Sequence, residues 1–197
     1  WSRGKRPWVA GDPGRKNDHL LIPAIYYDLC SVESEEEEIR RISQATFDTI
    51  YPDGVQPDTP VPVLARVGIA AALLGRAQDV QYLIPNQIRC LRPDLDFVGW
   101  KLTQVGVLPN RMTLREGVQA IGVQRLGRAA EALQLALLQS MPPQPAGEPV
   151  IRVFPAWPKH WDATFRLAAR RGFMVTASIR QGSVRFIEIH SRLGQTC

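Results

Sequence analysis

The sequence predicts an α+β protein in which a helical segment is followed by a small antiparallel sheet. Between about residues 33 and 140, apart from the irregular stretch 91–112, apolar residues recur at the spacing of one helix face, whereas from residue 165 they alternate with polar or small residues. A proline-rich stretch, residues 141–147, separates the two patterns. At 197 residues, with 45% hydrophobic and 22% charged residues, the chain is long and apolar enough to bury a core.

Residues 1–29 form an irregular first segment with no helical or strand periodicity. The chain begins with Trp1, and no signal-peptide pattern follows. We therefore interpret this segment as the truncated end of an upstream domain. The longest apolar run, Val67–Leu74, is too short to cross a bilayer, so we expect no membrane span.

Residues 30–141 are expected to be helical. The first helix is predicted over Glu33–Ile50, where acidic residues crowd the first turn, and the turn residues Tyr51–Gly54 end it. The second, Val63–Leu74, is apolar or small nearly all round and should be buried among other helices. Gly75 suits the position after its end, and a short helix from Ala77 should stop at Pro85.

The last helix is expected to be long. Residues Thr113–Glu116 fit a capping box, which predicts that the helix starts there. Gly117, Gly122 and Gly127 favour either a later start or a close approach of neighbouring backbone. The predicted buried stripe consists of Leu114, Val118, Ile121, Leu126, Ala130, Leu133 and Leu137.

Residues 148–197 are predicted to form a C-terminal β domain. Strands are expected around Phe165–Ala169, Phe173–Ile179 and Val184–Ile189, with a hairpin turn at Gln181–Gly182. The alternation slips between Phe186 and Ile187, which indicates a β-bulge. A sheet this small should pack against the helices.

Composition and motifs exclude several function classes. The net charge is +5, but the arginines are spread along the chain, and aromatic residues do not alternate with them. A solvent-exposed basic surface is therefore favoured over a nucleic-acid site. No GxSxG, P-loop, GxGxxG or HExxH motif is present. The histidines and the three cysteines do not have zinc-site spacing, so we expect no metal and no cofactor, and the compartment stays open. These residues are His19, His160, His190, Cys30, Cys90 and Cys197.

The segment Phe154–Asp162 holds two tryptophans and two prolines in nine residues. Trp157 and Trp161 could stack on sugar rings. Alternatively, they fill the seam between the helices and the sheet.

Several C-terminal phrases resemble the end of family 95 glycoside hydrolases, the α-L-fucosidase-like enzymes. The resemblance extends from about Leu126 to Cys197. The phrases are Leu137–Ser140, Val150–Pro158, Trp161, Leu167–Val175, Gly182, Ile189–Ser191, Gly194 and Cys197.

This resemblance implies a fold and an activity. The chain would supply part of an (α/α)6 toroid, residues 30–141, closed by a small antiparallel β-sandwich-like domain. The family hydrolyses α-fucosyl or related linkages with inversion, which needs a general acid and a base on opposite sides of the sugar. The rest of the parent enzyme, including the general acid, would lie upstream of Trp1. The fragment would then be inactive by itself, with carbohydrate as the substrate of the whole protein.

The resemblance also locates the base, and there the chain departs from the family. The position of the family's base falls on Val123 or Gln124, and neither is a carboxylate. The nearest carboxylate is Glu116, which we predict activates or positions water. Alternatively, Glu116 caps the last helix. Residues of suitable type to hold sugar hydroxyls and this water are Arg111, Arg115 and Gln119.

Two further hypotheses stay open. The missing base and the tryptophans favour a non-catalytic carbohydrate- or protein-binding module. A nucleic-acid role rests on the net charge alone. An incomplete toroid would also leave the apolar faces of Val63–Leu74 and Leu126–Leu138 exposed, which predicts association.

Overall fold

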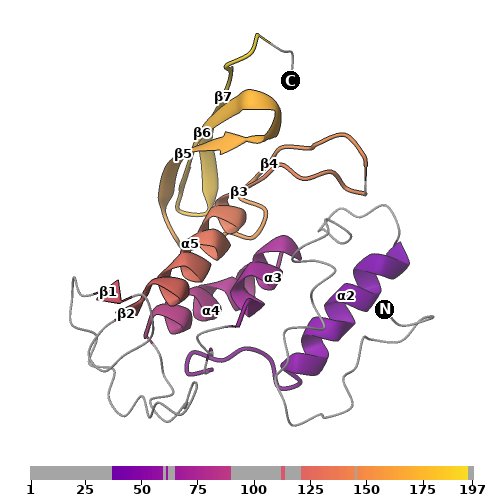
Figure 1. The fold of residues 1–197 in the computed structure, drawn as a ribbon, viewed down its shortest axis with the longest axis vertical. Coiled ribbons are helices and arrows are strands. Elements are labelled where there is room, and N and C mark those ends of the chain that lie inside the picture. Colours follow the sequence, from indigo (N-terminus) through magenta and orange to yellow (C-terminus); the bar gives the residue numbers. More distant parts are fainter. Residues whose placement is uncertain are drawn as a thin grey trace.

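The fold is α+β, as the sequence predicts, with a helical part beneath a small sheet (Figure 1). The computed structural model describes residues 37–59, 61, 65–89, 112–113, 121–144 and 146–194. The helices are α2 (Glu37–Ile50), α3 (Val67–Leu73), α4 (Ala77–Arg89) and α5 (Val123–Leu137), with a 3-10 turn at Arg170–Gly172. The strands are β1 (Met112–Thr113), β2 (Ile121–Gly122), β3 (Leu138–Gln139), β4 (Arg152–Val153), β5 (Ala163–Ala169), β6 (Phe173–Arg180) and β7 (Ser183–Ser191).

Helix α3 is buried on every side, as its composition predicts. All seven of its residues are buried, and the helix starts at Val67 instead of Val63. Its end is a Schellman motif, in which Gly75 N donates to Ala72 O and Arg76 N donates to Ala71 O. Gly75 has a φ of +73°, the left-handed conformation that glycine adopts without strain. The expectation that this helix would expose an apolar face is wrong.

Helix α4 continues through Pro85 to Arg89, whereas the sequence predicted that it would stop there. The proline cannot donate a backbone hydrogen bond to the preceding turn. Packing on both sides of it offsets that loss, because Leu83 and Ile84 are buried before it. After it, the buried Asn86 donates its side-chain amide to Thr59 O at 3.1 Å.

Helix α5 begins at Val123, so the later start that the glycines favoured is confirmed. Thr113 lies in β1, which pairs in parallel with β2, so the capping-box start is wrong. Of the predicted buried stripe, Leu137 is buried, whereas Ala130 and Leu133 are exposed. Within residues 126–137 of the helix, whose burial is described, the buried residues are Ala129, Ala132, Ala136 and Leu137.

Small side chains explain this choice of stripe. Helices α3 and α5 approach so closely that a Cβ built on Gly68 would lie 3.5 Å from the Ala132 Cβ. Leucine side chains would not fit such a seam, so alanines occupy it and Leu133 points away from it. A prediction from hydrophobicity alone therefore chose Ala130 and Leu133, each one residue after the alanine that is buried.

The proline-rich segment connects two strands that pair with each other. Leu138 lies opposite Val153 and Gln139 opposite Arg152, in antiparallel register. Backbone bonds from Phe154 N to Leu137 O and from Ala156 N to Ala136 O continue this contact onto the end of α5. The segment after the prolines thus runs antiparallel to the segment before them.

The three-stranded sheet has the order β5-β6-β7, and all of its pairs are antiparallel. The predicted hairpin turn is confirmed, with positive φ at Gln181 and Gly182. The predicted bulge is confirmed as well, although it lies earlier, because Ile179 faces Val184 while Ser178 faces Phe186. Arg185 is therefore the extra residue of the bulge.

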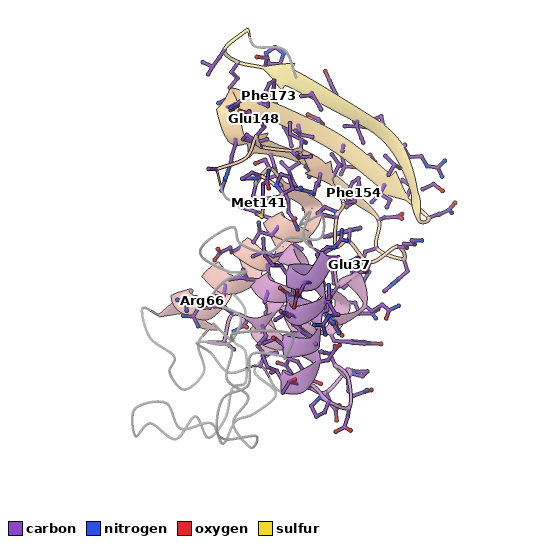
Figure 2. The ribbon with its side chains drawn as sticks, turned by 90° about the vertical axis from the view of Figure 1, so that its right-hand side faces the viewer. Glu37, Arg66, Met141, Glu148, Phe154 and Phe173 are labelled. Carbon is purple, nitrogen blue, oxygen red and sulfur yellow. The ribbon has the colours of Figure 1, made fainter. Side chains whose placement is uncertain are left out.

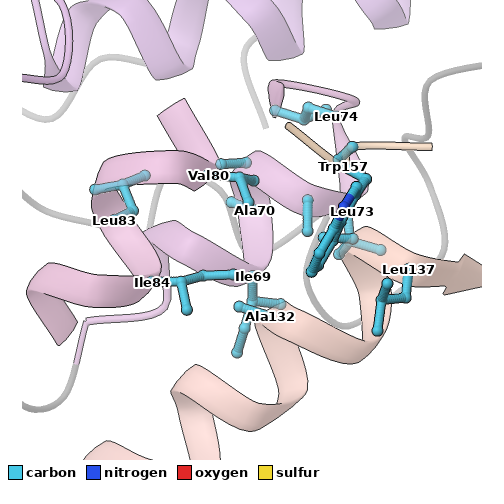
Figure 3. Packing of buried hydrophobic residues seen from close by; sticks show 14 of the residues in the cluster. Ile69, Ala70, Leu73, Leu74, Val80, Leu83, Ile84, Ala132, Leu137 and Trp157 are labelled. Atoms are coloured by element: carbon cyan, nitrogen blue, oxygen red, sulfur yellow. The ribbon is translucent and has the colours of Figure 1, made fainter. Parts of the chain in front are cut away.

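Helices and sheet share one hydrophobic core, as expected for so small a sheet. The buried residues of β6, such as Phe173 and Val175, belong to the same cluster as Ile69 and Leu83 of the helices. Figure 3 shows the close packing of α3, α4 and α5, with Trp157 beside Leu73 and Leu137.

Candidate functional site

The face of the C-terminal sheet that points away from the core carries a row of polar side chains. In an antiparallel sheet, directly opposed residues project from the same face. Arg166 of β5 lies opposite Thr176 of β6, which lies opposite Glu188 of β7. Val175 and Ala177, on either side of Thr176, point into the core. The alternation of the strands thus places these three polar residues together on the outer face.

This row lines a hollow in the sheet. The hollow has a volume of ≈ 410 Å³ and is open to solvent, so a ligand in it would keep part of its surface exposed. Met174 and His190, opposite each other in the next row, form the rest of its lining. Figure 2 shows the three strands as one curved layer above the helices, with side chains on both faces. We call this site the outer-face hollow.

The polar groups of the hollow are available to a ligand. Among the residues that the structure describes, no hydrogen bond or ion pair engages the side chains of Arg166, Thr176 or Glu188. A guanidinium offers donors in a fixed fork, a carboxylate offers acceptors only, and a hydroxyl offers both. Met174, in the next row, adds an apolar surface beside them. This combination can bind a polyol that has one apolar face.

In the neighbouring row on the same face, the polar side chains are hydrogen-bonded to one another. Thr164 and Ser178 share a hydrogen bond of 3.0 Å, and Arg180 Nη2 donates to Thr164 Oγ1 at 3.2 Å. Phe186 completes this row opposite Ser178, and 47% of it is exposed. An aromatic ring therefore lies open next to the hollow.

The predicted catalytic residue and three predicted substrate-binding residues lie outside the described residues. These are Glu116, Arg111, Arg115 and Gln119. One alternative can still be judged, because α5 begins seven residues after Glu116. Glu116 is therefore not the capping residue of that helix. Its predicted role toward water stays a prediction.

The fourth predicted substrate-binding residue, Trp157, lies in the seam between the helices and the sheet. Its relative exposure is 9%, and its indole N–H donates to Trp161 O at 2.8 Å. The two rings meet edge to face with centroids 5.3 Å apart. The alternative that the tryptophans fill the seam agrees with this placement. Stacking of Trp157 on a sugar would require most of its ring to become uncovered.

The outer-face hollow was not predicted from the sequence. The alternation of Arg166, Thr176 and Glu188 with apolar neighbours is visible in the sequence. Their meeting in one row depends on the bulge at Arg185, which shifts the register of β7 by one residue. An exact bulge position would have been needed to find the row.

Comparisons with known proteins leave the family open: no family model, curated protein or solved structure matches the chain. Within the described ranges, no three His, Cys, Asp or Glu side chains are grouped so that they could hold a metal ion. No helix in those ranges is both long and apolar enough to cross a membrane.

Proposed function

We propose that the chain is a carbohydrate-binding part of a carbohydrate-processing enzyme, and that the outer-face hollow is its binding site. The observation that carries this proposal is the row of Arg166, Thr176 and Glu188 in an open hollow of ≈ 410 Å³. Sugars present adjacent hydroxyls on a ring whose C–H face is apolar. The hollow offers charged donors and acceptors beside Met174, and the exposed Phe186 ring lies next to it.

The chemistry assigns a role to each residue. Glu188 would accept hydrogen bonds from two neighbouring hydroxyls, and Arg166 would donate to hydroxyl or ring oxygens. Hydrogen bonds to charged groups contribute about 1.5–3 kcal/mol each, so two such residues can give an exposed site measurable affinity. Phe186 would contact the apolar face of a second sugar unit.

The parent enzyme that we propose is a glycoside hydrolase similar to family 95. The chain order of α5, the proline-rich bridge, β4 and the three-stranded sheet is compatible with a toroid helix that leads into a closing β-sandwich-like domain. In this proposal the hydrolytic centre belongs to the intact parent enzyme, and residues 37–89 and 121–137 contribute helices to its toroid. Retention of full turnover by Glu116→Gln in that enzyme would rule out the role predicted for Glu116.

Removing either charge of the hollow should weaken glycan binding. We expect Arg166→Ala and Glu188→Gln each to lower the affinity of the 197-residue chain by about 10- to 100-fold. The measurement is calorimetric titration with the glycans that a glycan array selects. Both side chains are exposed, so the melting temperature should change little.

Matched controls separate the hollow from general surface charge. Lys159→Ala removes an exposed cation from the turn before β5, and Glu148→Gln removes an exposed carboxylate whose partner is Arg171. Neither should change glycan affinity. If the folded chain binds no glycan, or if the controls weaken binding as much as the hollow variants do, the proposal is wrong.

A further inference from the structure

The two charges of the outer-face hollow lie on opposite sides of it. Arg166 belongs to β5 and Glu188 to β7, and Thr176 of β6 lies between them. Two inter-strand spacings, about 10 Å, separate the backbones of β5 and β7. Both side chains line the hollow, and no ion pair joins them among the contacts that the structure describes. The hollow therefore has a basic side and an acidic side, with a hydroxyl between them.

The surroundings of the two charges differ. His190 lies two residues after Glu188 on β7 and lines the same hollow, so the carboxylate has an imidazole N–H donor on its own strand. The neighbours of Arg166 on the same face of β5 are Thr164 and Ala168, which carry no charge. Glu188 is also the only carboxylate in residues 163–192, which contain six arginines. An anion bound beside Arg166 is therefore opposed by one carboxylate of the sheet, whereas a cation bound beside Glu188 is opposed by Arg166 and the other arginines.

The guanidinium of Arg166 is also suited to a carboxylate by its shape. Two parallel N–H groups of a guanidinium can bind both oxygens of one carboxylate, which is the strongest hydrogen-bonded pair that arginine forms. The guanidinium of Arg180, in the neighbouring row, already has partners. Its Nη2 donates to Thr164 Oγ1 at 3.2 Å, and its Nη1 lies 3.8 Å from Asp162 Oδ2. Of these two arginines on the outer face, Arg166 is the one with a fork that a ligand can occupy.

We propose that the outer-face hollow selects a carboxylated sugar, a hexuronic acid unit of a glycan. This inference rests on the proposed glycan site and names its ligand class. The C5 carboxylate of such a unit and its C2 and C3 hydroxyls lie at opposite ends of the ring, as the two charges of the hollow do. The carboxylate would accept both N–H groups of Arg166. The hydroxyls would donate to Glu188, which as a carboxylate only accepts. The apolar C–H face of the ring would lie against Met174.

The probes are trimers of galacturonic acid and of mannuronic acid, each paired with its methyl ester. The ester keeps the ring and its hydroxyls but has no charge. A glucosamine trimer serves as the cationic sugar, and a triglutamate peptide as an anion without a sugar ring. Calorimetric titration of the 197-residue chain at pH 6 measures all of them. We expect at least one acid trimer to bind about tenfold or more tightly than its ester, because the ester cannot form the charged pair with Arg166. The glucosamine trimer and the peptide should bind more weakly than that acid.

Variants of the two charges should change the preference for acid over ester in different ways. Arg166→Gln removes the partner of the carboxylate, so the preference should fall from about tenfold to about one. Arg166→Lys keeps the charge without the fork and should retain only part of the preference. Glu188→Gln should weaken acid and ester alike and leave the preference at least as high, because both carry the same hydroxyls. Lys159→Gln removes an exposed cation outside the hollow and should leave the preference unchanged.

The outcomes separate this inference from the glycan site on which it rests. If the chain binds glycans but prefers esters or the glucosamine trimer, or makes no distinction, the hexuronic acid inference is wrong and the glycan site stands. If triglutamate binds as tightly as the acid trimers, the hollow is a general anion site and the inference is also wrong. A preference that survives Arg166→Gln, or that Lys159→Gln lowers as much, places the carboxylate elsewhere and overturns the inference. If the folded chain binds no glycan at all, both proposals fail together.

Discussion

Substituting Gln139 by glutamate is expected to cost about 3–5 kcal/mol of the free energy of unfolding at neutral pH. Gln139 is 1% exposed, and its side-chain nitrogen donates to Ala72 O at 2.7 Å and to Leu135 O at 3.1 Å. These carbonyls lie in the last turns of α3 and α5, and that of Ala72 also accepts a hydrogen bond from Gly75 N. One amide therefore caps two helices. A carboxylate there cannot donate, and it would add negative charge to two negative helix ends.

The pH dependence of this variant identifies the cause. In the unfolded chain the new carboxyl has an ordinary pKa of about 4.3. Burial beside two carbonyl oxygens raises its pKa in the folded state. The variant therefore loses stability relative to the wild type as pH rises from about 4.3 through the raised folded-state pKa, and its deficit is smallest below about pH 4.

Gln139→Leu is the uncharged control. It leaves the two carbonyls without this donor, so we expect a deficit of about 1–3 kcal/mol that does not change with pH. Urea unfolding at several pH values measures both variants. A Gln139→Glu deficit that is small, or independent of pH, would mean that the side chain reaches water and that the double cap is not important.

Gln139 belongs to Leu137–Ser140, one of the segments that resemble family 95, and its contacts show what that segment does in this fold. Within Leu137–Ser140, both leucines are buried, and Ser140 Oγ accepts a hydrogen bond from Arg170 N at 3.0 Å. Together with the Gln139 cap, these contacts connect α5 to α3 and to the turn after β5. The phrase therefore has packing and capping roles here, and its presence alone says little about catalysis.

The sequence predicted which helices and strands form better than it predicted where they end and which of their faces are buried. The all-apolar α3, the glycine that ends it, and the β5-β6-β7 hairpins follow from local periodicity and turn residues, which act over a few positions. The path of α4 through Pro85 and the alanine stripe of α5 could not be predicted in that way. Both depend on neighbours distant in the sequence, such as Thr59 for Asn86 and Gly68 for Ala132.

The candidate site was beyond sequence reasoning for a related reason. A regular hairpin from the Arg180–Ser183 pair would place Thr176 opposite Ile187 and direct Glu188 toward the core. The bulge at Arg185 reverses this, so that Ile187 and Ile189 face inward and Glu188 faces outward. One inserted residue thus brings Glu188 into the outer-face hollow and turns Ile187 and Ile189 toward the core side. Its effect is a matter of register, which composition and motif searches do not address.

Arg76→Ala is expected to cost about 2–4 kcal/mol of the free energy of unfolding, because one guanidinium connects α2 to the turn between α3 and α4. Its Nη1 donates to Gln44 Oε1 at 2.7 Å, Nη2 is 2.7 Å from Asp48 Oδ1, and Nε bonds Asp79. The guanidinium carbon also lies 4.2 Å from the centroid of the Phe47 ring. The Arg76 side chain is 21% exposed and that of Asp79 12%, so removal of the cation leaves a carboxylate poorly solvated.

Variants at the same network separate charge from geometry. Arg76→Lys keeps the charge but cannot reach three partners in a fork, so we expect about half of the loss. Asp79→Asn combined with Arg76→Ala should cost less than the sum of the two single losses, since the second substitution removes the uncompensated carboxylate. Glu148→Gln breaks an exposed ion pair with Arg171, and it should change stability by less than about 0.5 kcal/mol. If Arg76→Ala behaves like Glu148→Gln in urea unfolding, packing alone holds α2 in place and the network contributes nothing.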